Sequence, residues 1–258
     1  MTACVSPSLK SSAARWKRSG LRGSSVKAQR LRFRYRVTEN ALSLGNRDIV
    51  RAWESAVQAA GFNLAYSEGK RAAPQIAIAA PLPLGVTSGC ELAELFLAEF
   101  ANPEAVLAAV AASMASGIQP FSVEEAGLSA PSLQSRLRWA EYEVQLPAEG
   151  LDLQKPWRAV DHLLNAKTWA AEYRRETKVR LYDLRPLVLD IQIKGQDADC
   201  LLLNMRLRAE PDLTGRADQV ILALGLPPAS RIHRRCLYLG EVSPAVLAFR
   251  RAGQPDEA

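Results

Sequence analysis

The chain has 258 residues, of which 48% are apolar and 23% are charged, so it can bury one large hydrophobic core or two smaller ones. Its longest apolar stretches, such as residues 76–84, are far shorter than the ~20 residues that a membrane-spanning helix needs. We therefore expect a globular protein that does not span a membrane.

The net charge of +6 comes from the N-terminal tail. Residues 1–30 hold seven basic residues and no acidic one, which leaves 26 basic against 27 acidic residues for the rest of the chain. The tail is rich in Ser, Ala and Gly and has no apolar periodicity, so we expect 1–30 to be disordered, as well as a flexible C-terminus at 243–258. A transit peptide, a nucleic-acid-binding arm and a mis-started extension all share this composition.

The tail lacks the hydrophobic region of a secretory signal, which predicts a cytoplasmic protein, or import into an organelle if the source is eukaryotic. The cysteines are scattered, with no CxxC spacing, so reduced thiols are expected rather than a disulfide framework. Neither histidine has a second histidine or a cysteine pair near it in sequence, and no metal site is predicted. The cysteines and histidines of the chain are Cys4, Cys90, Cys200, Cys236, His162 and His233.

Residues 31–37 alternate apolar side chains with Arg32, Arg34 and Arg36, which predicts a strand with one buried face and one basic face. Asn46 is a suitable N-cap for a helix that Gly61 would end, and Asn102 with Pro103 is a second helix start. Further strands are expected at 75–84, 91–100 and 118–125. The order is βαββαβ, which is that of a ferredoxin-like unit.

Residues 127–134 form a plausible linker, after which a similar order of elements returns, as βαβββαβ or βαββαβ. Strands are expected at 138–146, 169–175, 187–194, 201–208 and 231–239, with helices at 156–165 and 216–224. The predicted fold is therefore α+β, with two ferredoxin-like βαββαβ halves in tandem, at 31–126 and 135–242, and antiparallel sheets. Helices would cover one face of each sheet and leave the other open to RNA or to a protein.

Several local segments together resemble the radical-SAM-linked proteins, a family of unassigned activity. Residues 31–35, 50–54, 64–69 and 81–86 resemble its first half, and 182–186, 223–226 and 231–234 its second half. Members of that family are fused to, or encoded beside, a radical SAM protein with a cobalamin-binding-type domain. The resemblance implies an accessory role, with a radical SAM protein as partner. The cluster of such an enzyme needs closely spaced thiolates, which this chain does not have.

The first candidate site follows the first predicted helix. Its cations and the backbone amides of the turn at 68–69 could hold a phosphate or a carboxylate. The alternative is a surface ion pair beside a glycine turn. The chain also departs from the family here, since Ala73 and Gln75 stand where the family has basic residues. The candidate residues are Asp48, Arg51, Ser67, Lys70 and Arg71.

The second candidate site is a basic stretch at 174–180, together with the turn after it and the last strand. Its arginines could reach RNA phosphates or the acidic face of a partner. The alternatives are a solvated hairpin and a structural clamp between Asp183 and Arg185. The candidate residues are Arg174, Arg175, Lys178, Asp183, Arg185, Arg231 and Arg234.

The sequence contains no glycine-rich phosphate loop and no Gly-Xaa-Ser-Xaa-Gly motif, so neither a cofactor nor a catalytic residue is predicted. The leading hypothesis is a non-catalytic accessory or substrate-recognition protein that works with a radical SAM enzyme. The alternative is an autonomous RNA-binding module for tRNA or rRNA. An RNA-processing enzyme on the same scaffold would need an acid/base pair that the sequence does not point to.

Overall fold

The computed structural model describes residues 25–69, 71–148, 154–175, 178–196 and 200–240. The predictions for most of the N-terminal tail, for the C-terminus and for Lys70 lie outside the described residues. In the described part of the chain, no helix is long and apolar enough to cross a membrane.

The described residues form a mixed α+β structure, which confirms the predicted fold class. The first half contains β1 (Gln29–Val37), α1 (Asn46–Ala59), β2 (Ile76–Ile78), β3 (Val86–Leu97), α2 (Pro103–Ser113) and β4 (Ile118–Ala126), and α3 (Leu133–Arg136) follows it. The second half contains β5 (Leu137–Pro147), α4 (Gln154–Asn165), β6 (Ala170–Arg175), β7 (Lys178–Asp183), β8 (Val188–Gln196), β9 (Cys200–Glu210), β10 (Leu213–Thr214), α5 (Ala217–Ala223) and β11 (Arg231–Leu239).

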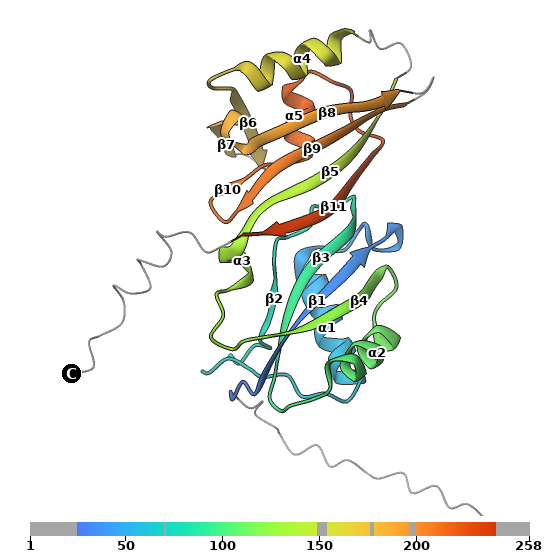
Figure 1. Cartoon of the computed structure of the whole chain (residues 1–258), viewed down its shortest axis with the longest axis vertical. Helices are drawn as coiled ribbons and strands as arrows, with labels where there is room; N and C mark the ends of the chain where they lie inside the picture. Colours follow the sequence, from blue (N-terminus) through green and yellow to red (C-terminus); the bar gives the residue numbers. More distant parts are fainter. Residues whose placement is uncertain (1–24, 70, 149–153, 176–177, 197–199, 241–258) are drawn as a thin grey trace, which may run out of the picture.

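Within the described ranges, nine strands form one continuous sheet, with β6 and β7 as a separate hairpin (Figure 1). In the first half the strand order is β4-β1-β3-β2, and in the second it is β11-β5-β9-β8, with antiparallel pairing throughout each half. This order is compatible with the expected ferredoxin-like unit. The prediction of antiparallel sheets needs a correction, because β11 of the second half pairs in parallel with β3 of the first over three residue pairs.

Local sequence signals account for the helices. The side chain of Asn102 accepts a hydrogen bond from the backbone N–H of Ala105 at 3.0 Å, and Pro103 occupies the first turn of α2. Helix α1 is followed by Gly61 with φ of 81°, a left-handed conformation that favours glycine. At Gly117, with φ of 89°, an added Cβ would lie 2.7 Å from Ala41, so this turn has no room for a side chain.

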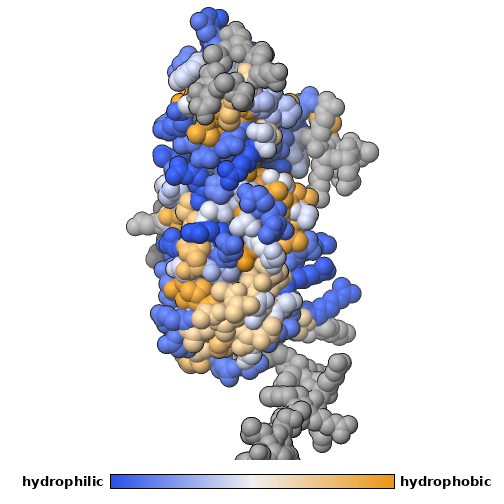
Figure 2. All heavy atoms as spheres, turned by 90° about the vertical axis from the view of Figure 1, so that its right-hand side faces the viewer, coloured by the Kyte–Doolittle hydropathy of each residue, from blue (hydrophilic) through white to orange (hydrophobic). Residues whose placement is uncertain are grey.

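Each half has its own hydrophobic core. In the first, Phe33 and Tyr35 of β1 pack on Trp53 of α1, with ring centroids 5.2 and 5.4 Å apart. In the second, the inner faces of β5 and β9 pack against α4 and α5, with Leu146 and Leu163 fully buried. Burial of each such side chain contributes about 1.5–3 kcal/mol. In Figure 2 a pale orange area lies on the lower, first half, whereas the second half is mostly blue on this face. The exposed residues of helix α2 in the first half are mostly alanines.

The expected open, basic face of the first half is wrong at Arg32, and the expected disorder of residues 1–30 is wrong at Gln29 and Arg30, which belong to β1. Arg30 and Arg32 are buried, and both form ion pairs with the buried carboxylate of Glu94, at 2.6 and 2.8 Å. The guanidinium of Arg30 also donates to the carbonyl oxygens of Gly127, Ala130 and Pro131. The segment between the halves therefore lies over part of this face, and among the β1 arginines only Arg34 and Arg36 stay exposed.

A second buried ion pair joins the halves. Arg234 of β11 donates to both carboxylate oxygens of Glu91 of β3, with Nε–Oε1 at 2.7 Å and Nη2–Oε2 at 2.5 Å. Its guanidinium also donates to the carbonyl oxygens of Ala80 and Pro81, while the Ser88 hydroxyl donates to Glu91. Burial alone would lower the pKa of Arg234, but the charge of Glu91 raises it. Glu91 therefore holds the buried arginine in its charged form.

We expect Arg234→Ala to destabilise the protein by about 3–5 kcal/mol, because it leaves the buried carboxylate of Glu91 without a partner. Urea unfolding of the two chains would measure this difference. The matched control is Arg51→Ala, which removes an arginine whose side chain is 76% exposed and whose ion pair with Asp48 is 3.7 Å long. The control should cost less than about 1 kcal/mol. Equal losses for the two variants would contradict the role given to the buried pair.

Candidate ligand-binding pocket

The structure gives the first set of predicted site residues local structural roles. The Asp48 carboxylate accepts from the backbone N–H of Gly45 at the start of α1 and pairs weakly with Arg51. The Ser67 hydroxyl accepts from the backbone N–H of Ala73, which closes the turn that contains Gly69 and Arg71. Among the described residues, no hydrogen bond or ion pair joins Asp48 or Arg51 to this turn.

The second set is separated by the fold. Arg175 pairs with Lys178 at the end of the β6–β7 hairpin, which was the alternative interpretation of this basic stretch, although no strand was expected at 178–183. The side chains of Arg174, Arg175 and Lys178 lie outside the described part. Arg231 is partly exposed and lies 3.8 Å from Glu39. Arg234 is buried, so its predicted place on an exposed basic strand is wrong.

Asp183 and Arg185 form the clamp that was the alternative to a binding role. The Asp183 Oδ1 atom accepts from the backbone N–H groups of Trp169 and Arg185, at 2.7 and 3.0 Å. The Arg185 guanidinium donates to the carbonyl oxygens of Leu164 and Val188. These four hydrogen bonds fix the hairpin to α4 and to the start of β8.

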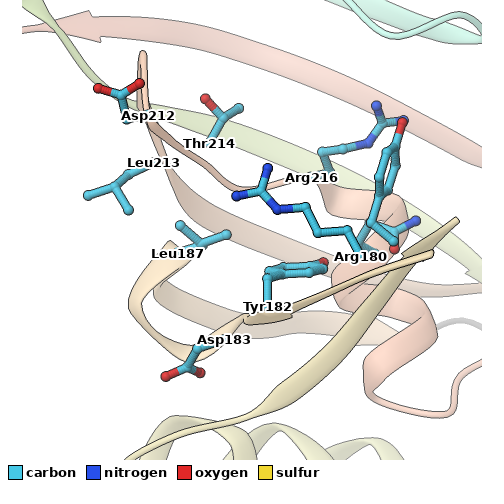
Figure 3. Close-up of a pocket in the computed structure, with 10 residues that line it drawn as sticks. Arg180, Tyr182, Asp183, Leu187, Asp212, Leu213, Thr214 and Arg216 are labelled. Carbon is cyan, nitrogen blue, oxygen red and sulfur yellow. The ribbon is translucent and has the colours of Figure 1, made fainter. Parts of the chain in front are cut away.

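A cavity of about 320 Å³ lies between the β6–β7 hairpin, β10 and the start of α5 (Figure 3). Aromatic rings and arginines from three separate parts of the chain line it. They include Tyr173 of β6, Arg180 and Tyr182 of β7, Thr214 of β10, and Arg216 and Gln219 at α5. The cavity thus offers flat apolar surfaces beside positive charge.

Arg216 is held in place on one side of this pocket. Its Nε and Nη2 atoms donate to the two carboxylate oxygens of Asp218, at 3.1 and 3.2 Å, and its guanidinium lies 5.7 Å from the Tyr173 ring centroid. Partial burial lowers the pKa of Arg216, but the hydrogen bonds and charge of Asp218 outweigh this and raise it. Arg216 is therefore a fixed cation that Asp218 partly neutralises.

Arg180 is the less constrained cation of the pocket. Its side chain is exposed and extends from β7 into the middle of the hollow, above the Tyr182 ring, whereas the Asp183 carboxylate points away (Figure 3). Within the described ranges, Arg180 forms no ion pair. Burial raises the pKa of the Tyr182 hydroxyl, so that ring stays neutral. A free guanidinium over a neutral ring suits a ligand with a flat part and an anionic part.

Two further cavities adjoin this pocket through Arg216. One, of about 350 Å³, is lined by Pro81, Gln134 and Arg234 among others and also shares Thr214 with the first. The other, of about 110 Å³, is lined by residues 83–86 and Asp218. The hollows bring together residues 81–86 and Tyr182, which the sequence places about 100 residues apart. Around Arg216, the second half therefore meets the first.

The residues that form this pocket are not among the predicted site residues. Arg180 lies in the predicted basic stretch but is not one of its candidates, Arg216 is predicted only as the start of a helix, and Tyr173 as part of a strand. The alternation of Arg180 and Tyr182 with Val179 and Leu181 was an available signal, because it places the first two on one face of β7. In the described part of the chain, no group of three or more His, Cys, Asp and Glu is placed to hold a metal.

Residues 30–214 match the model of a family described as uncharacterised proteins conserved in bacteria, DUF2344. The chain belongs to this family. No match was found among curated proteins. The link of this sequence to radical SAM proteins stays a prediction.

Some solved structures are similar to the chain at low identity. A chain of a Cbf5-Nop10-Gar1 complex shares 12% identity with a TM-score of 0.43, and the match covers 74% of this chain and 45% of that one. A chain of an H/ACA RNP bound to a substrate RNA containing 2'-deoxyuridine shares 11% identity with a TM-score of 0.38, over 83% of this chain and 53% of that one. The chain thus spans about half the length of these structures, and similarity at this level carries no inference about function.

We expect Asp183→Ala to destabilise the protein by about 1–2 kcal/mol, because the N–H groups of Trp169 and Arg185 lose their acceptor. Asp183→Asn, which keeps the Oδ1 acceptor, should cost less. Thermal unfolding of both variants would measure this. If Asp183→Ala left the stability unchanged, the clamp assignment would be wrong.

Proposed function

We propose that this protein is a substrate-recognition protein that works with a radical SAM enzyme, and that the pocket around Arg180 and Arg216 is its binding site. The observation that carries the proposal is the exposed Arg180 guanidinium, which extends between Tyr182 and Thr214 without an ion-pair partner among the described residues. Guanidinium and phenol groups hold and orient ligands well, and this use needs no chemistry from the chain itself.

The partner follows from the sequence segments that resemble the radical-SAM-linked proteins. Two of these segments, 81–86 and 182–186, contribute residues to the pocket and its neighbouring cavities. The cysteines of this chain are not spaced as cluster ligands, so the proposal assigns the radical chemistry to the partner. This chain would present the substrate.

An autonomous RNA-binding module is the second candidate, and the pocket's composition favours it. Tyrosine rings stack on unpaired bases, and arginines contact phosphates or stack on bases themselves. Tyr173, Tyr182 and Arg180 offer both kinds of contact within one hollow. A single-stranded RNA segment would fit such a site better than a duplex, because duplex bases are already stacked.

Copurification from the native host tests the proposed partnership. The tagged full-length protein, captured at moderate salt, should recover a radical SAM enzyme that an unrelated tagged protein of similar charge does not recover. The captured proteins would be identified by mass spectrometry. If the host encodes such an enzyme and none is recovered, the partnership is wrong.

Fluorescence anisotropy with a labelled single-stranded RNA tests the second candidate. We expect Arg180→Ala to weaken binding by about 1–2 kcal/mol, or roughly 5- to 30-fold, and to reduce the salt slope by about one. The matched control is Arg47→Ala, which removes the same charge from an exposed position on α1 in the first half. Equal weakening by both variants, or no binding by the parent at low salt, would remove RNA binding at this pocket.

A further inference from the structure

Cys90 and Cys236 lie side by side where the two halves join, although the sequence separates them widely. The parallel pairing of β11 with β3 ends at the pair Arg234 and Ser88. Cys236 and Cys90 each follow two residues after that pair, so they occupy equivalent positions on neighbouring strands. Adjacent strands lie about 4.8 Å apart, which is within the Cα separation that a disulfide spans.

Both strands are irregular beside the two cysteines. The pairing of β3 with β1 shifts register between Glu91 and Ser88, and the pairing of β11 with β5 shifts between Arg234 and Cys236. The strands also approach closely here, because a Cβ added at Gly89 would lie 3.1 Å from the carbonyl oxygen of Arg235. Bulges of this kind re-aim side chains, and here they lie beside both thiols.

The two thiols interact with each other, and the interaction shifts their pKa values in opposite directions. The interaction with Cys236 lowers the pKa of Cys90 to about 6 despite the opposing effect of burial, and the charge of Arg34 lowers it further. The same interaction, with burial, raises the pKa of Cys236. Both side chains are only partly buried. These shifts favour the thiolate form of Cys90, which is within reach of solvent, and the thiol form of Cys236 beside it.

We propose that Cys90 and Cys236 form a thiol–disulfide site that reacts reversibly with low-molecular-weight disulfides and, when oxidised, joins β3 to β11 covalently. Cys90 is the attacking thiol, Cys236 is the resolving thiol, and Arg34 is a positioning residue that stabilises the thiolate. The assignment is independent of what the pocket around Arg216 binds.

The reaction with oxidised glutathione balances as two exchanges. The Cys90 thiolate attacks one glutathione sulfur, a protein–glutathione S–S bond forms, and the glutathione S–S bond breaks with its electron pair on the departing thiolate. Cys236 then loses its proton to the departed thiolate, attacks the Cys90 sulfur and expels the second glutathione as a thiolate that takes up a proton from water. Two protein thiols are oxidised, and one glutathione disulfide is reduced to two thiols.

The second exchange is easier than the raised pKa of Cys236 in the reduced protein suggests. Its pKa is raised chiefly by the neighbouring Cys90 and its negative charge, and further by burial. Once Cys90 is in a mixed disulfide, its sulfur is neutral, so the largest cause of the raised pKa is removed and only the effect of burial stays. The attack by Cys90 therefore prepares Cys236 for its own step.

The first test treats the full-length protein with oxidised glutathione at neutral pH and maps disulfides by mass spectrometry under non-reducing conditions. We expect a Cys90–Cys236 bond, lost in Cys90→Ser and Cys236→Ser and kept in Cys200→Ser, the matched control. Oxidation should also raise the urea midpoint of the parent and of Cys200→Ser, but not of Cys236→Ser. Thiols that all survive the treatment, or bonds that involve Cys4 or Cys200 instead, would overturn the proposal.

The second test measures how fast the Cys90 thiol of the parent protein is alkylated at different pH values, so its main result does not require a variant to fold. The rate of alkylation by iodoacetamide should rise with pH to half its maximum near pH 6, as the pKa of about 6 requires. Arg34→Gln should move this midpoint to higher pH, and Arg34→Lys should restore it in part. A midpoint near that of a free thiol, about 8.5, would overturn the thiolate assignment.

Discussion

The guanidinium of Arg234 and the carboxylate of Glu91 are both shielded from water, so each depends on the other for its charge to be tolerated. One lies on β11 and the other on β3, the two strands that join the halves. The pairing between these strands is short, and a one-residue slip would turn both side chains to the wrong face. The ion pair therefore fixes the register by which two separate cores share one sheet.

The same interaction positions the surroundings of the candidate pocket. Arg234 donates to the carbonyl oxygens of Ala80 and Pro81, and this segment lines the cavity that adjoins the pocket at Arg216. Glu94, three residues after Glu91 on β3, has a comparable part in the first half, where Arg30 connects it to the segment between the halves. Two buried carboxylates on one strand thus hold the segment between the halves, the pairing of β3 with β11 and one wall of the adjoining cavity in place.

Most of the elements could be predicted from the sequence, because their signals are local. The alternation in β1, the Asn102–Pro103 start of α2 and the strand that became β6 each depend on a few neighbouring residues. The pairing of β3 with β11 could not be predicted, because nothing local connects residues so far apart. The alternating arginines of β1 misled for a related reason. Alternation identifies two faces, but it does not say that the linker covers one of them.

The pocket was missed because it depends on an addition to the second half. The β6–β7 hairpin stands between α4 and β8, where the first half passes from α1 to β2 without such a hairpin. The hairpin brings Arg180 and Tyr182 close to the start of α5. The pairing of β3 with β11 brings residues 83–86 to the other side of Arg216. Cys236 follows Arg234 by two residues, and Cys90 immediately precedes Glu91. A covalent bond between these cysteines would therefore hold fixed the two strands that carry the buried ion pair, and with them one wall of the cavity next to the pocket.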